Sequence, residues 1–378
     1  MKIIYCIHSV YNPGGMERVL LNKVSYLCSK LNWDITVVTT DQKERPPFYP
    51  FPEKIKRIDL KINYSDDNHK NIMGKIIGYL WRRRLHKKAL THLLEREQAD
   101  IVVSLYPSES SFICDIKDGS KKVLELHFCK FFRLQYRRKG LLKYIDRYRT
   151  KQDEQIVQHF DRFIVLTEED RGYWGNLLNI EVIPNAALLV GNLCSDVSAH
   201  RVIAVGRLDY QKGFDRLIEA WSLVNKQVKC KDWHLDIFGQ GEWHGKLQQM
   251  IDDYQMNDSV HINNPSNRIE DEYVKSSILV MSSNYEGFPM VMIEAMSCGV
   301  PVISFNFQSG PKDIIQDGVN GVLVDNGDII GLADAIIKLI CDENLRRSLS
   351  TNARKVIETY SEDVVMQKWI SIFKSLSE

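Results

Sequence analysis

Short apolar runs alternate with amphipathic stretches along the whole chain, and this alternation limits the possible folds more than any other pattern. In the first half, the apolar runs have strand length and longer stretches of helical periodicity separate them. The runs cover residues 2–8, 34–40, 101–104, 122–126, 162–166 and 181–183. Strands that alternate with helices predict a parallel sheet with right-handed crossover connections.

The same alternation starts again after residue 200. Strands are predicted at 201–205, 234–237, 260–262, 278–281 and 302–305, and helices at 214–225, 245–254, 290–297 and from 329 onward. Residues 186–199 have no clear periodicity and form the predicted linker. A chain of 378 residues has room for two domains of roughly 100–200 residues each. We therefore predict an α/β fold of two Rossmann-like domains, with ligands at the carboxyl ends of the strands.

The two halves carry opposite charge, although the formal net charge of the chain is only +1. Residues 1–190 contain 32 Lys and Arg against 23 Asp and Glu, whereas residues 191–378 contain 18 against 26. This asymmetry predicts a basic surface on the first domain. No run reaches the ~20 apolar residues of a membrane span. The first residues do not resemble a signal peptide, and the eight cysteines form no C-x-x-C pair, so we expect a cytoplasmic protein.

Two cations follow the predicted strand at 201–205. Arg207 and Lys212 lie on one loop that leads into the helix at 214–225. Cations this close repel each other unless an anion lies between them, and a diphosphate is the natural candidate. The alternative is a pair of solvated surface charges.

Two glutamates flank the next informative turn, between the strand at 278–281 and the helix at 290–297. Glu286 precedes the helix, and Glu294 lies about one turn inside it. The first backbone amides of the helix, at residues 288–291, are expected to lack an intrahelical partner and can bind an anion. Two carboxylates beside such a site suit hydroxyl recognition, of a ribose and of a sugar. The alternative is that both glutamates are ordinary surface residues without a ligand.

Further candidates lie in the first half. Residues 12–17 join the first strand to the first helix, and Gly14 and Gly15 would let a ligand approach the backbone closely. A dinucleotide G-x-G-x-x-G fingerprint is absent, and an ordinary turn remains possible. His127 follows the strand at 122–126, and His8 occupies a similar but less favoured position after the first strand. No histidine or aspartate spacing indicates a metal site, so we expect no obligatory metal.

Together these motifs resemble the retaining glycosyltransferases of family 4, which have the GT-B fold. The resemblance covers nearly the whole chain and is carried, in order, by GGMERV, EVIPN, VGRLDYQKGFD, EGFPMVMIE and SGPKDIIQDGVNGVLV. The most similar subgroup consists of bacterial enzymes that build capsule, exopolysaccharide or O-antigen repeat units. The resemblance implies two domains facing across a cleft. An acceptor-binding domain would cover 1–188 and receive a C-terminal helix at 362–378, and a nucleotide-sugar-binding domain would cover 199–361.

The resemblance also implies roles for these residues. Arg207 and Lys212 would hold the donor diphosphate, Glu294 the nucleotide ribose, and Glu286 the hydroxyls of the transferred sugar. His127 would lie near the donor sugar, on the acceptor side, and completes the predicted catalytic set. The other predicted donor-binding residues are Gly14, Gly15, Asn264, Gly287, Phe288, Pro289, Met290 and Val291. Neither a cofactor nor a metal is implied.

One position departs from the family. Asn264 stands beside the expected nucleobase pocket, where the family often has glycine. Asparagine also tolerates left-handed backbone, and family prevalence favours UDP over GDP or ADP. The family implies retention at the anomeric carbon. Attack on the same face, with the leaving phosphate accepting the proton, fits better than a covalent intermediate because no carboxylate is an obvious nucleophile.

Two basic and aromatic stretches predict contact with an anionic membrane surface. Residues 70–88 combine basic side chains with interleaved apolar ones, and residues 130–151 contain nine Lys or Arg and one acid. The residues assigned to this membrane and acceptor side are Arg82, Arg83, Arg84, Lys87, Arg133, Arg137 and Arg138. We expect peripheral association with the inner face of the membrane and a lipid-diphosphate-linked saccharide acceptor. Solvated helix faces or nucleic-acid binding are the alternatives, but no nucleic-acid recognition motif accompanies the stretches.

Three alternatives to a transferase stay open. A phosphorylase of the same fold needs a cofactor lysine, which the sequence does not locate, and epimerases of this fold usually lack the Glu-x7-Glu pair. A non-catalytic sugar-nucleotide-binding component of a polysaccharide assembly complex would be expected to lose the Arg207, Lys212, Glu286 and Glu294 set. Donor sugar, acceptor, linkage and oligomeric state are not predicted.

Overall fold

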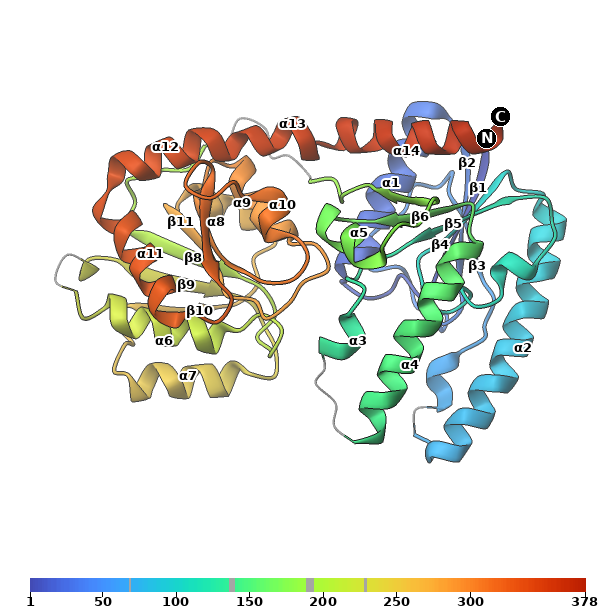
Figure 1. Cartoon of the computed structure of the whole chain (residues 1–378), viewed down its shortest axis with the longest axis horizontal. Coiled ribbons are helices and arrows are strands. Elements are labelled where there is room, and N and C mark those ends of the chain that lie inside the picture. Colours follow the sequence, from blue (N-terminus) through green and yellow to red (C-terminus); the bar gives the residue numbers. More distant parts are fainter. Residues whose placement is uncertain (68, 136–139, 188–193, 228–229) are drawn as a thin grey trace. The chain divides into compact units, whose positions relative to one another are not determined.

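The chain forms two compact α/β units in a computed structural model, which describes residues 1–67, 69–135, 140–187, 194–227 and 230–378 (Figure 1). Unit 1 comprises residues 1–166, 170–183 and 366–378. Unit 2 comprises residues 167–169 and 184–365. Each unit contains one parallel sheet.

Unit 1 is built on a seven-stranded sheet of order β3-β2-β1-β4-β5-β6-β7. Its strands are β1 (Lys2–Ile7), β2 (Asp34–Thr39), β3 (Lys56–Asp59), β4 (Ile101–Ser104), β5 (Lys121–Glu125), β6 (Arg162–Val165) and β7 (Ile180–Val182). Tyr5 of β1 pairs in register with Val37 of β2 on one side and Val103 of β4 on the other. The strand order reverses between β1 and β4, so the loops after these strands diverge and leave room for a ligand.

The helices of unit 1 cover the sheet with apolar faces. They are α1 (Gly15–Leu31), α2 (Ile72–Glu97), α3 (Phe132–Gln135), α4 (Leu141–Ile156) and most of α5 (Glu168–Trp174). In α1, the buried side chains Leu20, Val24 and Leu27 recur at the spacing of one helical face. The first half of α2 differs, because its apolar side chains are largely exposed. In Figure 1, α2 and α4 both extend beyond the sheet, toward the lower edge of the view.

Unit 2 has a six-stranded sheet of order β10-β9-β8-β11-β12-β13. Its strands are β8 (Arg201–Val205), β9 (His234–Phe238), β10 (Val260–Asn263), β11 (Ile278–Met281), β12 (Val302–Asn306) and β13 (Gly321–Asp325). Its helices are α6 (Phe214–Val224), α7 (His244–Asp253), α8 (Ile269–Val274), α9 (Met290–Ser297), α10 (Pro311–Ile314), α11 (Ile329–Cys341), α12 (Glu343–Ala353) and α13 (Ile357–Tyr360). The strand order reverses here between β8 and β11.

The last helix, α14 (Glu362–Ser377), begins in unit 2 and ends in unit 1. From Met366 onward its residues belong to unit 1, where Trp369 and Phe373 are fully buried. Trp33 packs edge-on against Phe373 with ring centroids 6.1 Å apart. The predicted return of a C-terminal helix to the first domain is therefore confirmed.

The predicted α/β class with two parallel sheets is confirmed, but two strands were missed. The first is β3, whose residues Lys56 and Arg57 are exposed at the sheet edge. The second is β13, at the edge of the other sheet, which carries only two fully buried positions. β3 has a single apolar residue, Ile58, because part of this edge strand faces water. β13 does contain an apolar run, residues 322–324, which the sequence interpretation overlooked. Within the described ranges, no helix is both long enough and apolar enough to cross a lipid bilayer.

Candidate active site

Two loops meet where the strand order of unit 2 reverses. Residues 206–213 follow β8, and residues 282–289 follow β11. The Asn284 amide donates to the Gln211 carbonyl at 2.7 Å, and the Asn284 side chain donates to the Tyr210 carbonyl at 2.6 Å. The Ser282 hydroxyl donates to the Lys212 carbonyl at 3.1 Å. These bonds fix the two loops against each other by backbone atoms, largely independently of their charged side chains.

Gly213 allows this close approach. Its φ of +60° lies in the left-handed region, and a Cβ atom there would come within 2.4 Å of the Ser282 carbonyl oxygen. Any larger residue would push the loops apart. The sequence KGF at the start of α6 therefore positions Lys212 directly beside the second loop.

Lys212 and Glu286 form the centre of the site. Lys212 Nζ lies 2.7 Å from Glu286 Oε1, which also accepts from the Ser283 hydroxyl at 2.6 Å. Gln211 Nε2 donates to the other carboxylate oxygen at 3.2 Å. Glu286 is buried, so this carboxylate is held in one orientation by three neighbours.

Arg207 extends the same network outward. Its guanidinium donates to Gln211 Oε1 at 2.9 Å and lies 3.5 Å from Asp209. Its side chain is largely exposed, which leaves it accessible to an anion. The structure thus brings Arg207, Lys212 and Glu286 together through Gln211, a residue that the sequence interpretation missed. Whether an anion binds between the two cations stays a prediction.

The start of α9 differs in one detail from the expected anion site. The Met290 amide donates to the Phe288 carbonyl at 2.9 Å, so it is already engaged, contrary to the expectation for residues 288–291. Pro289 has no amide hydrogen and is the N-cap residue. The turn is tighter than an open helix start because the 288–290 bond closes it.

Glu294 lies inside α9 and contacts a buried aromatic residue of α8. The Tyr273 hydroxyl donates to Glu294 Oε2 at 3.5 Å. Burial raises the pKa of Tyr273, and the Glu294 charge raises it further. Asn264 directly follows β10, at the carboxyl end of this strand, and is exposed. The predicted donor-side residues of unit 2 thus all belong to loops at one sheet edge or to the helix that begins there.

The loop at residues 12–17 of unit 1, which contains Gly14 and Gly15, leaves open space at one position. A Cβ atom on Gly15 would meet no protein atom within 4 Å, whereas one on Gly14 would collide with the Glu17 carboxylate at 2.0 Å. Burial raises the pKa of Glu17, and the nearby His127 charge opposes this shift. Gly15 therefore has room beside it for another group, as its predicted role requires.

His127 follows β5 and is almost completely buried. Its Nε2 atom lies 3.2 Å from Glu125 Oε1, and Glu125 also pairs closely with Lys23 of α1. Lys23 Nζ stands 3.7 Å from the ring centroid of Trp369 in α14. Burial alone would raise the pKa of Glu125, but the charges of Lys23 and His127 hold it at about 2.

Lys23 and Glu125 were missed at the sequence level. A signal existed, because each charge interrupts an apolar pattern: Lys23 lies on the buried face of α1, and Glu125 ends an apolar strand. Buried charges of this kind require a partner.

Several basic residues assigned to the membrane side have internal partners instead. Arg82 Nε donates to Asp67 at 2.8 Å, Arg83 Nε donates to the Ser111 hydroxyl at 3.2 Å, and Lys87 lies 2.7 Å from Asp115. These contacts brace α2 against neighbouring loops. Arg84 is exposed. Arg137 and Arg138 lie outside the described residues.

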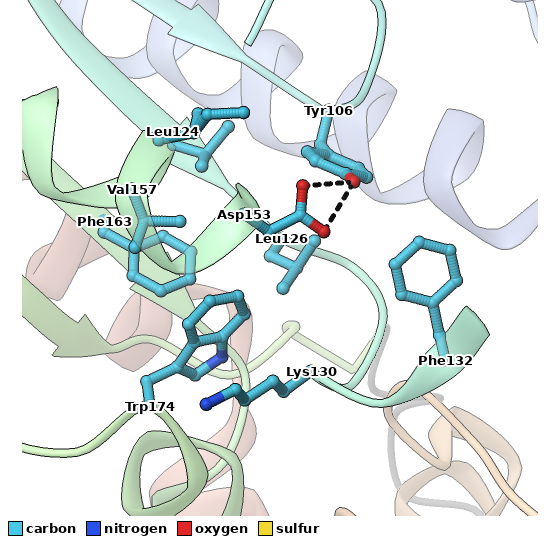
Figure 2. A pocket seen from close by; sticks show the side chains of 10 residues that line it. Tyr106, Leu124, Leu126, Lys130, Phe132, Asp153, Val157, Phe163 and Trp174 are labelled. Atoms are coloured by element: carbon cyan, nitrogen blue, oxygen red, sulfur yellow. Dashed lines mark hydrogen bonds between the residues drawn. The ribbon is translucent and has the colours of Figure 1, made fainter. Parts of the chain in front are cut away.

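Arg133 likewise belongs to an internal network. It pairs closely with Asp153 and with the Tyr106 hydroxyl. Figure 2 shows that Tyr106 also donates to both oxygens of Asp153, at 3.0 and 3.1 Å. This network borders a small, mainly apolar pocket of unit 1. The pocket is lined by Tyr106, Leu124, Leu126, Lys130, Phe132, Asp153, Ile156, Val157, Phe163 and Trp174. The parts of the chain that the structure describes contain no group of three or more His, Cys, Asp or Glu side chains able to hold a metal ion.

Two family models match the two halves of the chain. Residues 13–187 match "Glycosyltransferase Family 4", and residues 195–356 match "Glycosyl transferases group 1". The chain is 29% identical to the amylovoran biosynthesis glycosyltransferase AmsD of Erwinia amylovora, over 98% of this chain and 99% of that protein.

A second relative has a more specific name. The chain is 22% identical, over 98% of both proteins, to a Campylobacter jejuni enzyme named GalNAc-alpha-(1->4)-GalNAc-alpha-(1->3)-diNAcBac-PP-undecaprenol alpha-1,4-N-acetyl-D-galactosaminyltransferase. Among solved structures, Anabaena HepE in complex with UDP and glucose matches with a TM-score of 0.74 and 16% identity. That match covers 99% of this chain and all of HepE, and it supports the fold alone.

Proposed function

Because the chain belongs to glycosyltransferase family 4 and has the GT-B fold, we propose that it transfers a hexose or N-acetylhexosamine from a UDP-sugar to a saccharide acceptor. Of its relatives of similar length, one is named for amylovoran biosynthesis and another for transfer of N-acetylgalactosamine to an undecaprenol-diphosphate-linked saccharide. The observation that carries the proposal is the network of Arg207, Gln211, Lys212 and Glu286 at the strand-order reversal of unit 2. This network combines cations for a diphosphate with a fixed carboxylate for sugar hydroxyls.

The proposed roles follow the chemistry of each group. Arg207 and Lys212 stabilise the negative charge that grows on the departing diphosphate. Glu286 accepts hydrogen bonds from the transferred sugar, and Glu294 from the ribose. His127 and Gly15 contribute from unit 1. The acceptor oxygen forms its bond to the anomeric carbon while the bond to phosphate breaks, and the acceptor proton passes to the leaving phosphate.

Retention by attack on the same face is part of the proposal. A covalent intermediate would need a free carboxylate as nucleophile, but both oxygens of Glu286 already accept hydrogen bonds or face Lys212. Metal independence is also proposed, because the two cations can supply the charge that a divalent ion supplies elsewhere.

A lipid-linked acceptor and peripheral membrane binding complete the proposal. Met73, Ile76, Ile77, Leu80 and Trp81 recur at the spacing of one helical face of α2, and each is more than half exposed. Exposed apolar stripes of this size are unusual on soluble surfaces. Exposed Lys75, Arg84 and Lys88 accompany the stripe, and Tyr144 and Tyr148 are exposed on α4. Apolar and basic side chains together suit an anionic bilayer surface.

Replacing Ile77 and Leu80 by serine is expected to weaken binding to phosphatidylglycerol vesicles by roughly tenfold or more, because both side chains would leave the lipid interface. Vesicle co-sedimentation measures the effect. Ile330→Ser is the matched control, since Ile330 is 66% exposed on α11 of unit 2. Equal binding by the wild type and the double variant would contradict this membrane surface.

A UDP-release assay across a panel of UDP-sugars tests the proposed reaction. Release with one sugar, insensitive to EDTA and increased by membrane extract, is the expected result. UDP binding by calorimetry without turnover would instead favour a non-catalytic sugar-nucleotide-binding component. If the protein neither releases UDP from any donor nor binds UDP, the assignment of UDP as the nucleotide is overturned.

A further inference from the structure

A half-exposed histidine and a buried aspartate meet at the carboxyl ends of β1 and β2, next to the strand-order reversal of unit 1. His8 directly follows β1, and Asp41 lies two residues beyond β2. His8 Nε2 stands 3.2 Å from Asp41 Oδ2. The Asp41 side chain is fully buried, whereas the His8 side chain is 41% exposed. A buried carboxylate thus holds a partly exposed imidazole at the end of β1, and β1 is one of the two strands that border the ligand-binding reversal of a doubly wound sheet.

The aspartate is fixed by its own neighbours. Asp41 Oδ2 accepts from the Ser65 amide and Oδ1 from the Ser65 hydroxyl, both at 3.0 Å. Lys43 Nζ lies 3.9 Å from Oδ1 and 3.1 Å from Asp66. The backbone amides of Thr40 and Asp41 both donate to the His8 carbonyl, at 3.1 and 3.0 Å. These contacts hold the His8–Asp41 pair rigidly on both strands.

The orientation leaves one ring nitrogen for a ligand. The carboxylate at Nε2 favours the tautomer with its proton on that nitrogen, so Nδ1 carries the lone pair. Thr40 Oγ1 lies 3.5 Å from Nδ1, a distance at which a hydrogen bond is weak. Nδ1 can therefore accept a hydrogen bond from an incoming hydroxyl.

His86 is a structural histidine of this protein, and its surroundings differ from those of His8. It is buried, its Nδ1 lies 3.1 Å from the Tyr64 hydroxyl, and its ring packs edge-on against Phe112. Burial lowers the pKa of His86 to about 4. His8 has a buried acidic neighbour, Asp41, and a partly exposed ring, neither of which is needed to fill a core.

The loops around His8 resemble a saccharide-binding surface in composition. The Phe48 amide donates to the Val10 carbonyl at 2.8 Å, and the Val10 amide donates to Gln42 Oε1 at 3.0 Å, so the loops after β1 and β2 are tied together. Phe48 is exposed on this pair of loops. An exposed aromatic ring on these tied loops offers a sugar an apolar face to stack on.

We propose that His8, oriented by Asp41, binds and orients a hydroxyl of the saccharide acceptor. The inference rests on the proposed function, which already requires an acceptor but assigns no residue to it beyond His127 and the basic segments. His8 Nδ1 accepts the hydrogen bond of the acceptor hydroxyl, and Asp41 is a positioning residue that keeps the ring in the productive tautomer. The proton itself still leaves with the phosphate, so no further reactant is needed.

The test compares two activities of one enzyme. His8→Asn is expected to lower kcat/KM for transfer to octyl hexosides by roughly 10- to 100-fold, since one oriented hydrogen bond is lost. Hydrolysis of the UDP-sugar without acceptor should stay within about twofold, because donor binding is untouched. His92→Asn is the matched control: His92 is also exposed and lies 3.9 Å from a carboxylate, that of Glu95. Equal loss of both activities, or unchanged transfer, would overturn the proposal.

A second readout does not require turnover. In nitrogen-15 NMR spectra, Asp41→Asn should shift the His8 tautomer away from the Nε2-protonated form, and octyl hexosides should shift the His8 ring signals of the wild type. Shifts in a wild type that transfers no sugar would preserve the saccharide site and reject the proposed reaction. Normal transfer with no His8 shift and no effect of His8→Asn would reject the site and keep the reaction.

Discussion

Lys212→Ala is expected to lower the rate of sugar transfer by on the order of 10²–10³-fold, the usual effect of removing one preorganised group that stabilises transition-state charge. Two effects combine in this variant. The diphosphate loses a cation, and Glu286 loses the ammonium group that lies 2.7 Å from its carboxylate. Steady-state UDP release with the preferred donor measures the rate.

The fold should survive this substitution, because the loops around Lys212 are joined through backbone atoms. Ser282 bonds to the carbonyl of Lys212, not to its side chain. Lys275→Ala is the matched control, since Lys275 pairs with Glu272 at 3.1 Å on the same unit, away from the two loops. If Lys212 and Glu286 act as one unit, the variant with both residues changed to alanine should lose little more activity than Glu286→Ala alone. A Lys212→Ala enzyme with unchanged turnover would contradict the assigned role.

Lys23→Met is expected to destabilise the protein by up to ~3–5 kcal/mol, the typical cost of removing one partner of a buried ion pair, because only His127 then remains beside the Glu125 carboxylate. Both side chains are buried, and Glu125 has a second oxygen without a hydrogen-bond partner. Lys23 also packs against Trp369, so its removal affects the contact with α14. Denaturant unfolding followed by tryptophan fluorescence measures the free energy of unfolding.

The pH dependence of unfolding should be weaker in this variant. In the wild type, Glu125 has a pKa of about 2, below its ordinary value of 4.5. Its contribution to stability is therefore present above pH 4.5 and is lost as the pH falls toward 2. Without Lys23, one of the two charges that lower the pKa of Glu125 is lost while burial still opposes the other, that of His127, so the pKa of Glu125 should rise and the variant should lose less stability than the wild type as the pH falls.

Replacing both members of the pair separates charge from packing. Lys23→Met combined with Glu125→Leu should recover most of the lost stability, because apolar pairs of similar volume often replace buried ion pairs without loss. A double variant as unstable as Lys23→Met would show that packing, not the unpaired charge, causes the effect.

The sequence was sufficient for the parts of the fold and site that depend on local order. Loops at the carboxyl ends of parallel strands share one sheet edge, so the order of strands and loops along the chain was enough to group Arg207, Lys212 and Glu286. The edge strand β3 could not be found, because its partial exposure removes the continuous apolar pattern on which strand prediction depends. β13 retains an apolar run at residues 322–324 and was overlooked.

Pairings between distant residues were inaccessible for a different reason. Lys23 and Glu125 are 102 residues apart, and no local sequence pattern predicts that their side chains form an ion pair. The same limit explains the basic stretch of α2, where Arg82 and Lys87 were interpreted as surface charge. Their partners Asp67 and Asp115 come from loops outside the helix. Composition predicts the sign of a surface but not which charges are already neutralised.

The path of α14 has a consequence for how the protein is made. Most of unit 1 is synthesised before unit 2, yet Trp369 and Phe373, which are synthesised after unit 2, are fully buried in unit 1. The side of unit 1 that contains Trp33 and Lys23 is therefore not yet covered by α14 while all of unit 2 is synthesised. At roughly 5–20 residues per second this interval lasts on the order of ten seconds or more. Unit 2 can begin to fold during that time, so the unit that starts first is completed last.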